Sequence, residues 1–332
     1  MNVLSCFDGI ACGLVALCRA GIKVDNYYAS EIDLYAIKIA TKNHPEIIEL
    51  GDIQNWKSWN LPHIDLIIGG SPCQGFSNAG QRLNFDDPRS KLFFTFVDIL
   101  HHYKPAYFLL ENVKLKSAWR DVITEYMEVE PILINSALVS AQNRERYYWS
   151  NIPNISQPED KGILLKDIVL PNTFPVAIHN IYGGFQEKSV RVFEDKSPTI
   201  RTARGGGHIP SLVTDSLVHS QSAIDYMNRQ VADGRNHWDF GHYSDVRNKK
   251  SASVVANFFK GVPYNVFRDW NCIRKLHPIE CERLQTLKDG YTEGVSDTQR
   301  YKAIGNGWTV DVVAHIFRSL ADQMQHKQGW LR

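Results

Sequence analysis

The sequence of 332 residues lacks several features that would place a protein in a specialised class. Its six cysteines never form a C-x-x-C pair, so their spacing predicts neither a zinc site nor a disulfide framework, and a reducing cytoplasm is the expected setting. No apolar run reaches the roughly 20 residues that a membrane span needs, so no membrane partner is expected. Residues 1–5 carry no basic segment, which predicts no secretory signal.

An excess of charge of one sign is also missing, because the formal net charge is +1. Any surface that binds nucleic acid must therefore be local. A G-x-G-x-x-G turn is absent, which disfavours a nicotinamide dehydrogenase. A zinc cytosine deaminase needs P-C-x-x-C, but Pro72-Cys73 is followed by Gln74-Gly75-Phe76. The histidines show no metal-ligand spacing, so no metal is predicted.

What is present is an alternation of short apolar runs with helical patterns, typical of an α/β fold with a mostly parallel sheet. We predict strands at 3–7, 25–30, 64–70, 106–110, 132–139 and 144–150. We predict helices at 14–20, at 34–41 and at 91–102.

The composition changes after about residue 171, where Gly, Ser, Asn, Arg and His become frequent. We interpret residues 171–270 as a smaller, loop-rich domain. Helical spacing returns near the end, where an apolar stripe is predicted to pack back on the first domain; its members are Val310, Val313, Phe317, Leu320 and Met324. The larger domain would then consist of residues 1–170, completed by residues 271–332.

Cys73 lies in a tight loop directly after the predicted strand 64–70. Pro72 fixes φ and Gly70 permits an unusual turn, so the thiol is expected on a stiff support at the carboxyl end of a parallel strand. Glu111 closes the strand 106–110 at the same edge of the sheet. Taken singly, Cys73 is more often a buried structural cysteine and Glu111 a solvated strand end. Together they suggest nucleophilic attack with acid assistance.

Two arginines follow in the segment Gln142-Asn143-Arg144-Glu145-Arg146. If the segment is extended, Arg144, Arg146 and Tyr148 share one face. Two arginines there can hold a carboxylate and bind a carbonyl or phosphate oxygen. An edge strand with solvated charges is the alternative for an isolated R-x-R pattern.

The turn at 7–13, Phe-Asp-Gly-Ile-Ala-Cys-Gly, lets a nucleotide-like ligand approach the backbone at a helix N-terminus. Glu31 ends the second strand, where a carboxylate can bind ribose hydroxyls. Asp52 and Ile53 offer an acceptor and an apolar neighbour for an adenine. Without a pyrophosphate-binding turn, a cofactor with a nucleoside alone fits better than NAD, although glycines that merely turn the chain would explain the pattern about as well.

In this order, the blocks resemble the DNA (cytosine-5)-methyltransferase family, of bacterial or phage type, with a turn at 8–13 similar to the animal de novo enzymes. The matching blocks are 7–13, Glu31, Asp52, 71–74, 111–113, Gln142-x-Arg144-x-Arg146, 274–284 and 305–310. The resemblance implies a Rossmann-like methyltransferase domain that uses S-adenosyl-L-methionine, plus a target-recognition domain at 171–270. The Gly-Trp after Asn306 departs from many bacterial members, which often have small or aliphatic residues there.

The resemblance further implies methylation of C5 of a flipped cytosine in a short double-stranded DNA site, through a covalent adduct of Cys73 at C6. The implied catalytic residues are Cys73, Glu111, Arg144 and Arg146. The implied cofactor-binding residues are Phe7, Asp8, Gly9, Ile10, Glu31, Ile32, Asp52, Ile53, Pro72, Leu92 and Asn306. The implied DNA-binding residues are Gln74, Ser77, Arg82, Thr199, Arg201, Thr202 and Arg204.

Two other functions stay open at the level of sequence: the same chemistry on tRNA or another structured RNA, and a non-catalytic DNA-binding regulator. We expect a monomeric, cytoplasmic protein of prokaryotic or phage origin, within or outside a restriction-modification system. The recognition sequence does not follow from the residues, because base readout depends on side-chain geometry in region 171–270.

Overall fold

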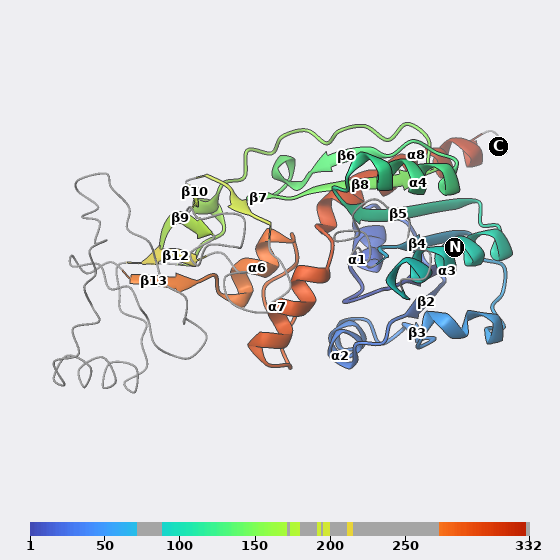
Figure 1. Cartoon of the computed structure of the whole chain (residues 1–332), viewed down its shortest axis with the longest axis horizontal. Helices are drawn as coiled ribbons and strands as arrows, with labels where there is room; N and C mark the ends of the chain where they lie inside the picture. The colour runs from blue at the N-terminus through green and yellow to red at the C-terminus, as the bar shows by residue number, and fades with distance from the viewer. Residues whose placement is uncertain are drawn as a thin grey trace.

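The computed structural model describes residues 1–71, 88–170, 173–179, 191–193, 195–199, 211–214 and 272–329. Several predicted site residues lie outside these ranges: Pro72, Cys73, Gln74, Ser77, Arg82, Arg201, Thr202 and Arg204. Figure 1 shows the elements along the chain, with the large sheet and the small sheet at opposite ends.

Residues 1–150 alternate strands and helices, as predicted. The strands are β1 (Asn2–Cys6), β2 (Asn26–Ser30), β3 (Ile48–Glu49), β4 (Leu66–Gly69), β5 (Tyr107–Val113), β6 (Ile132–Asn135), β7 (Gln142–Asn143) and β8 (Glu145–Ser150). The helices are α1 (Cys12–Arg19), α2 (Leu34–Asn43), α3 (Pro88–Tyr103) and α4 (Ser117–Met127), with 3-10 turns η1 (Ile53–Ser58) and η3 (Ser136–Leu138).

Seven strands form the large sheet in the order β3-β2-β1-β4-β5-β8-β6. The pairs from β3 to β5 are parallel, whereas β8 runs antiparallel to both β5 and β6. The predicted α/β class with a mostly parallel sheet is confirmed. The strand order reverses between β1 and β4, and ligands of such sheets bind at the carboxyl ends of the strands beside this reversal.

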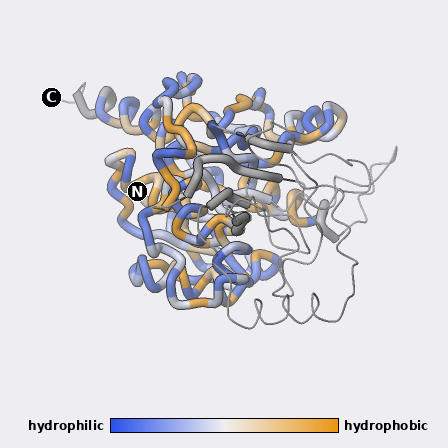
Figure 2. Tube along the Cα trace, turned by 90° about the vertical axis from the view of Figure 1, so that its left-hand side faces the viewer, coloured by the Kyte–Doolittle hydropathy of each residue, from blue (hydrophilic) through white to orange (hydrophobic). Residues whose placement is uncertain are grey.

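Both faces of the large sheet are covered, which explains why its central strand β4 is a continuous apolar run. Successive residues point to opposite faces: Val3 joins the core under α1, α2 and α8, whereas Leu4 joins the core under α3, α4 and η1. Along the helices in Figure 2, hydrophobic and hydrophilic stretches alternate, as expected where one face of each helix packs inward.

The strand predicted at 132–139 is wrong beyond residue 135. β6 ends at Asn135, whose side chain accepts a hydrogen bond from the Ala137 amide (3.0 Å) and so caps the 3-10 turn η3. An asparagine side chain offers the backbone this local alternative to a strand. The chain therefore leaves the sheet at Asn135, although apolar residues return at Leu138 and Val139.

A second sheet has the order β10-β9-β12-β13. Its strands are β9 (Thr173–His179), β10 (Arg191–Phe193), β12 (Ser211–Thr214) and β13 (Cys272–Lys275). β13 lies just after the boundary that we predicted at 270/271, yet it pairs with β12 inside this small sheet. A short parallel pair of β7 with β11 (Ser197–Pro198) connects this region to the large-sheet domain.

The last part of the chain forms α6 (Pro278–Leu284), α7 (Asp297–Asn306) and α8 (Val310–Gly329). In Figure 1, α6 and α7 lie between the two sheets. The predicted apolar stripe is confirmed, because Val313, Phe317 and Leu320 are fully buried in the core that also contains α1. Among the described residues, no helix combines the length and apolar character that crossing a membrane requires.

Candidate active site

The loop between β1 and α1 has an unusual backbone at the carboxyl edge of the sheet. Phe7 (φ 58°), Gly9 (φ 65°) and Ala11 (φ 59°) all adopt positive φ, which non-glycine residues rarely do. Ala11 is the N-cap of α1 and makes no side-chain capping bond. Strained backbone of this kind clusters at functional sites, and an uncapped helix N-terminus presents free N–H groups.

Glu31, directly after β2, is held rigidly beside this loop. Its Oε2 accepts a hydrogen bond from the Gly9 amide (2.9 Å). Its Oε1 accepts bonds from the amides of Ile32 (2.8 Å) and Asp33 (2.9 Å). Three N–H donors therefore fix the carboxylate directly after its strand, and the predicted binding of a ribose by Glu31 stays a prediction.

Two further carboxyl groups lie near Glu31 and have raised pKa values. Burial raises the pKa of Asp8 to about 6, with Glu31 adding repulsion, although Tyr27 donates a hydrogen bond to its Oδ1 (2.6 Å). Burial, together with the charges of Asp8 and Glu31, raises the pKa of Glu49 to about 7. Within the described part of the chain, Asp8 Oδ2 and Glu49 Oε2 are buried without a hydrogen-bond partner. This crevice therefore suits a positively charged ligand.

The remaining predicted pocket residues differ in accessibility. The Asp52 side chain accepts a hydrogen bond from the Gln54 amide (2.9 Å) and caps η1. Ile53 is only 4% exposed and belongs to the core, against which Leu92 also packs. Ile32, by contrast, is 71% exposed beside Glu31. An isoleucine so exposed at the mouth of a crevice offers an apolar surface to a ring.

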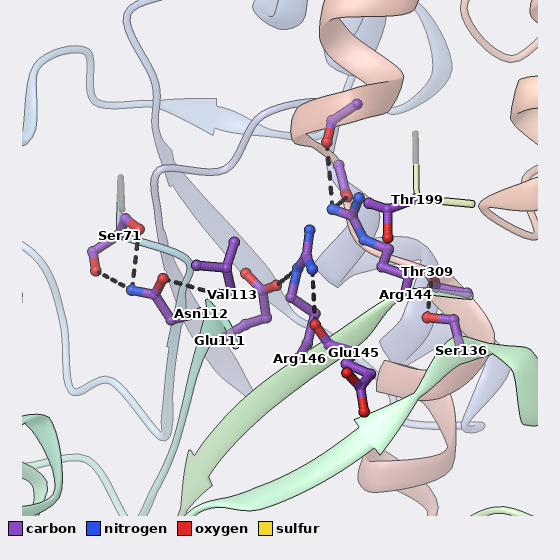
Figure 3. Close-up of polar contacts among 12 residues, drawn as sticks. Ser71, Glu111, Asn112, Val113, Ser136, Arg144, Glu145, Arg146, Thr199 and Thr309 are labelled. Carbon is purple, nitrogen blue, oxygen red and sulfur yellow. Dashed lines mark hydrogen bonds and ion pairs between the residues drawn. The ribbon is translucent and has the colours of Figure 1, made fainter. Parts of the chain in front are cut away.

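The second half of the site lies at the ends of β4 and β5. Glu111 Oε1 forms an ion pair with Arg146 Nε (2.9 Å), and both side chains are largely buried (Figure 3). Asn112 donates hydrogen bonds to the Ser71 hydroxyl (3.2 Å) and carbonyl (3.4 Å). Ser71 is the residue before Pro72-Cys73, so the chain enters the predicted nucleophile loop from a point fixed beside Glu111.

Arg144 lies near Arg146 and Glu111, whose charges both act on it, although the strand that we predicted from residue 144 begins at Glu145. It lies between β7 and β8, outside the strand that contains Arg146. Its guanidinium donates to the carbonyls of Gly307 (2.9 Å) and Gly305 (3.3 Å) at the end of α7. Burial lowers the pKa of Arg144 to about 9, with Arg146 adding repulsion and Glu111 opposing it. The ion pair that the structure shows for Glu111 is with Arg146 (Figure 3).

The turn after α7 closes the site from the C-terminal part of the chain. A Cβ built on Gly70 would lie 3.0 Å from both Trp308 Nε1 and Glu111 Oε2, so a larger residue at 70 would collide with both. A Cβ on Gly13 would lie 3.5 Å from the Trp308 ring. Trp308 therefore lies near both the loop 7–13 and Glu111. From the sequence, Trp308 is expected only to differ from many members of the family. Asn306, which we predicted to bind the cofactor, is exposed two residues before it.

Thr199, which we predicted to bind DNA, donates a hydrogen bond to the Asn143 carbonyl (2.6 Å) on β7. Nearby, Lys196 donates to the carbonyls of Ala137 (2.9 Å) and Ser140 (3.2 Å). Segment 195–199 is thus attached to the large-sheet domain beside Arg144 (Figure 3). Any DNA contact by Thr199 would be made from this anchored position.

The described residues thus form two adjoining parts: an acidic crevice at the ends of β1 to β3, and a buried carboxyl–arginine pair at the end of β5. Within the same part of the chain, His, Cys, Asp and Glu side chains do not gather in a group that could hold a metal ion. The arrangement suits binding of a cationic nucleoside beside a planar polar substrate that needs a proton donor and a carbonyl-binding cation.

A comparison with protein families matches residues 1–322 to the family described as C-5 cytosine-specific DNA methylase. The type II methyltransferase M1.ScrFI of Lactococcus lactis subsp. cremoris is 29% identical over 321 residues, covering 91% of this chain and 74% of that protein. The orphan methyltransferase M.SPRI of Bacillus phage SPR is 26% identical and covers 99% of each chain.

Solved structures with the same fold include a mutant of Spodoptera frugiperda DNMT2, with a TM-score of 0.60, 19% identity, and coverage of 96% of this chain and 99% of that one. A putative DNA modification methyltransferase encoded within an E. coli prophage has a TM-score of 0.58 and 21% identity, with coverage of 98% and 99%. At these identities the two structures establish the fold alone.

Proposed function

The chain belongs to the C-5 cytosine-specific DNA methylases and is a DNA (cytosine-5)-methyltransferase, and we propose that its methyl donor is S-adenosyl-L-methionine and its substrate a cytosine extruded from duplex DNA. The observation that carries this proposal is the Glu111–Arg146 pair (2.9 Å) next to Ser71, from which the chain continues to Cys73. A base inside a duplex cannot reach such a buried pair, so the cytosine must leave the stack.

The residues of the acidic crevice fit the proposed donor. S-adenosylmethionine carries a sulfonium and an ammonium group, and the partnerless oxygens of Asp8 and Glu49 provide negative charge for a cation. The fixed Glu31 carboxylate suits the ribose, the exposed Ile32 the adenine ring, and the uncapped N-terminus of α1 the donor's carboxylate. When bound, the donor supplies an electrophilic methyl group.

The protein's own groups act on the cytosine. C5 is too weakly nucleophilic by itself, and addition of the Cys73 thiolate to C6 makes C5 enamine-like. Glu111 shares a proton with N3 and stabilises the ring as charge builds up there, while Arg146 binds O2 and holds the Glu111 carboxyl in place. After methyl transfer a base removes the C5 proton, and the thiolate of Cys73 leaves as the C5–C6 double bond forms again.

We further propose that residues 171–270 recognise the target sequence. Gln74, Ser77 and Arg82 would contact DNA from the nucleophile loop, and Thr199, Arg201, Thr202 and Arg204 from the target-recognition side. The attachment of segment 195–199 to β7 supports this proposal, because residues 200–204 follow directly from Thr199, which is bonded to Asn143, the residue before Arg144.

Conversion-based methylation sequencing of DNA from cells that express the protein tests the activity and reveals the site together. We expect 5-methylcytosine at one short sequence, and none in cells that express Cys73→Ala. Unmethylated DNA in both would contradict the assignment to DNA, and equal methylation in both would contradict the covalent mechanism.

A further inference from the structure

The carbonyl groups at the C-terminus of α7 are bound by side chains from distant parts of the chain. The last carbonyls of a helix have no partner within the helix. Here Arg144 donates to the carbonyls of Gly305 (3.3 Å) and Gly307 (2.9 Å). Gln285 Nε2 donates to those of Ile304 (2.9 Å) and Gly307 (3.2 Å). The two side chains therefore share the Gly307 carbonyl.

The side-chain amide of Gln285 is fully buried and fully used. Besides its two donated bonds, its Oε1 accepts hydrogen bonds from the Thr309 hydroxyl (2.8 Å) and from Gln142 Nε2 (3.3 Å). An amide has two N–H donors and two acceptor lone pairs, so these four bonds fix a single orientation. Ser136 extends the chain of bonds by donating to Thr309 (2.9 Å; Figure 3).

The turn that Gln285 holds lies against the loop 7–13 on its other side. A Cβ on Gly307 would lie 3.2 Å from Cys12 Sγ, so the backbone of the turn packs closely against the Cys12 side chain. Asn306 is exposed. Trp308 is half-buried, and its ring lies next to Gly13 and Gly70. Arg144 and Gln285 thus hold the backbone of the turn, while the side chains of Asn306 and Trp308 remain available to a ligand.

We propose that Gln285 is a positioning residue for methyl transfer: it fixes the turn 306–308 against the loop 7–13 and, through the shared Gly307 carbonyl, holds Arg144 beside Glu111 and Arg146. The inference rests on the proposed function, because it takes this turn and loop as part of the donor pocket. A displacement of about 1 Å in a reacting group can cost about 100-fold in rate, so an orienting bond network of this kind has a large effect on catalysis.

The test measures binding of S-adenosylhomocysteine by calorimetry, well below the melting temperature of each variant. Gln285→Leu keeps the approximate volume but removes all four amide bonds, and we expect it to weaken binding by about tenfold or more. Thr309→Val removes only the hydroxyl that orients the amide, and we expect about a threefold loss. For both variants kcat at saturating donor also falls, because Arg144 loses its fixed position.

Ser140→Ala is the matched control. Ser140 is as buried as Gln285 and donates to the carbonyl of Leu284 (2.6 Å), the residue before Gln285. In the part of the chain that the structure describes, no hydrogen bond joins Ser140 directly to residues 306–308. We expect this variant to lose stability but to bind S-adenosylhomocysteine as the unaltered protein does. If it weakened binding as much as Gln285→Leu, general destabilisation would explain the result and the inference would be wrong.

Equal binding by the unaltered protein, Gln285→Leu and Thr309→Val would overturn the inference alone. Absence of binding by the unaltered protein would overturn the proposed donor and the inference with it. If Gln285→Leu does not fold, the comparison of Thr309→Val with Ser140→Ala decides.

Discussion

Glu111 is the residue on which the proposed chemistry most depends, and its two carboxyl oxygens have different neighbours. Oε1 is paired with Arg146 (2.9 Å), whereas Oε2 lies over Gly70, where the missing side chain leaves room. One oxygen is thus held while the other can reach a substrate. Glu145, the residue before Arg146, instead forms its ion pair with Lys114 (2.9 Å) at the surface.

We expect Glu111→Gln to lower kcat by about 100-fold or more, because the amide cannot share a proton with N3 as the carboxyl does. Steady-state methyl transfer to the mapped DNA site measures the effect. The matched control is Glu145→Gln, for which kcat stays within about twofold, since surface ion pairs contribute little. A kcat for Glu111→Gln as high as that of the control would exclude the proposed role.

The acidic crevice predicts a pH dependence of stability and of donor binding. The pKa values of Asp8 (about 6) and Glu49 (about 7) lie above their ordinary values of 3.8 and 4.5, so the folded protein without donor binds more protons than the unfolded chain between these limits. Its free energy of unfolding therefore falls as pH rises from about 4 to about 7. Chemical denaturation at several pH values measures this.

A cationic donor favours the charged forms of Asp8 and Glu49. The dissociation constant of the donor should therefore fall as pH rises through the upper part of this range, and binding should release protons. Calorimetry in buffers of different ionisation enthalpy detects that release. Glu49→Gln should remove the part of the dependence near pH 7. Donor affinity that is independent of pH from 5 to 8 would show that the donor binds elsewhere.

At the level of single elements, the start of α2 links the crevice to α7. Asp33 is the N-cap of α2, and its Oδ1 accepts bonds from the amides of Tyr35 (3.0 Å) and Ala36 (3.4 Å). Its Oδ2 pairs with Lys302 of α7 (2.5 Å). Asp33 thus has two roles: its amide helps to hold Glu31, and its side chain attaches the segment 31–33 to α7.

Asp33→Ala should destabilise the protein by about 1 kcal/mol or somewhat more, because both the cap and the ion pair are lost. Asp33→Asn keeps a capping oxygen, so its cost should be limited to the ion pair, which is at most about 1 kcal/mol for a half-exposed pair. Denaturant midpoints of the two variants separate the contributions. A larger cost for the asparagine variant would contradict the capping role.

At the scale of the whole molecule, the two ends of the chain complete one face of the large sheet. Residues of α1 and of α8 share a single core with Val3 and Ile68. The C-terminal helix α8 therefore supports α1 and the loop 7–13 before it, although about 300 residues of sequence lie between them. The intervening chain returns through α6 and α7, which brings Gln285 and Trp308 to the site.

Phe317 in α8 is fully buried, so its substitution tests how much the packing of α8 on the large sheet contributes to stability. Phe317→Ala should lower the free energy of unfolding by about 3–5 kcal/mol through lost burial and the resulting cavity. Arg318→Ala, at the exposed next position, is the control and should change stability by less than about 0.5 kcal/mol. Thermal unfolding compares them. A small effect of Phe317→Ala would mean that α8 contributes little to the core.

Features that depend on local patterns follow from the amino-acid sequence. Apolar runs and helical spacing predicted the strands and helices of the large sheet, and polar residues at the ends of strands predicted Glu31, Asp52 and Glu111. Except beyond Asn135, the strand and helix predictions are confirmed by the large sheet. A parallel sheet brings the carboxyl ends of its strands to one edge, so the three polar residues are expected there, and their roles in binding and catalysis stay predictions. The same rule placed the loop 7–13 and the chain leading into Cys73 at that edge.

Contacts between segments that are distant in sequence depend on the folded chain and cannot be predicted from local patterns. Asn135 ends its strand by bonding to the backbone, which an apolar run does not reveal. Arg144 donates to the carbonyls at the end of α7, because a buried guanidinium binds where several acceptors converge. Glu49 and Gln285 acquire their roles from groups that the fold brings near them. Their local sequence carries no sign of those partners.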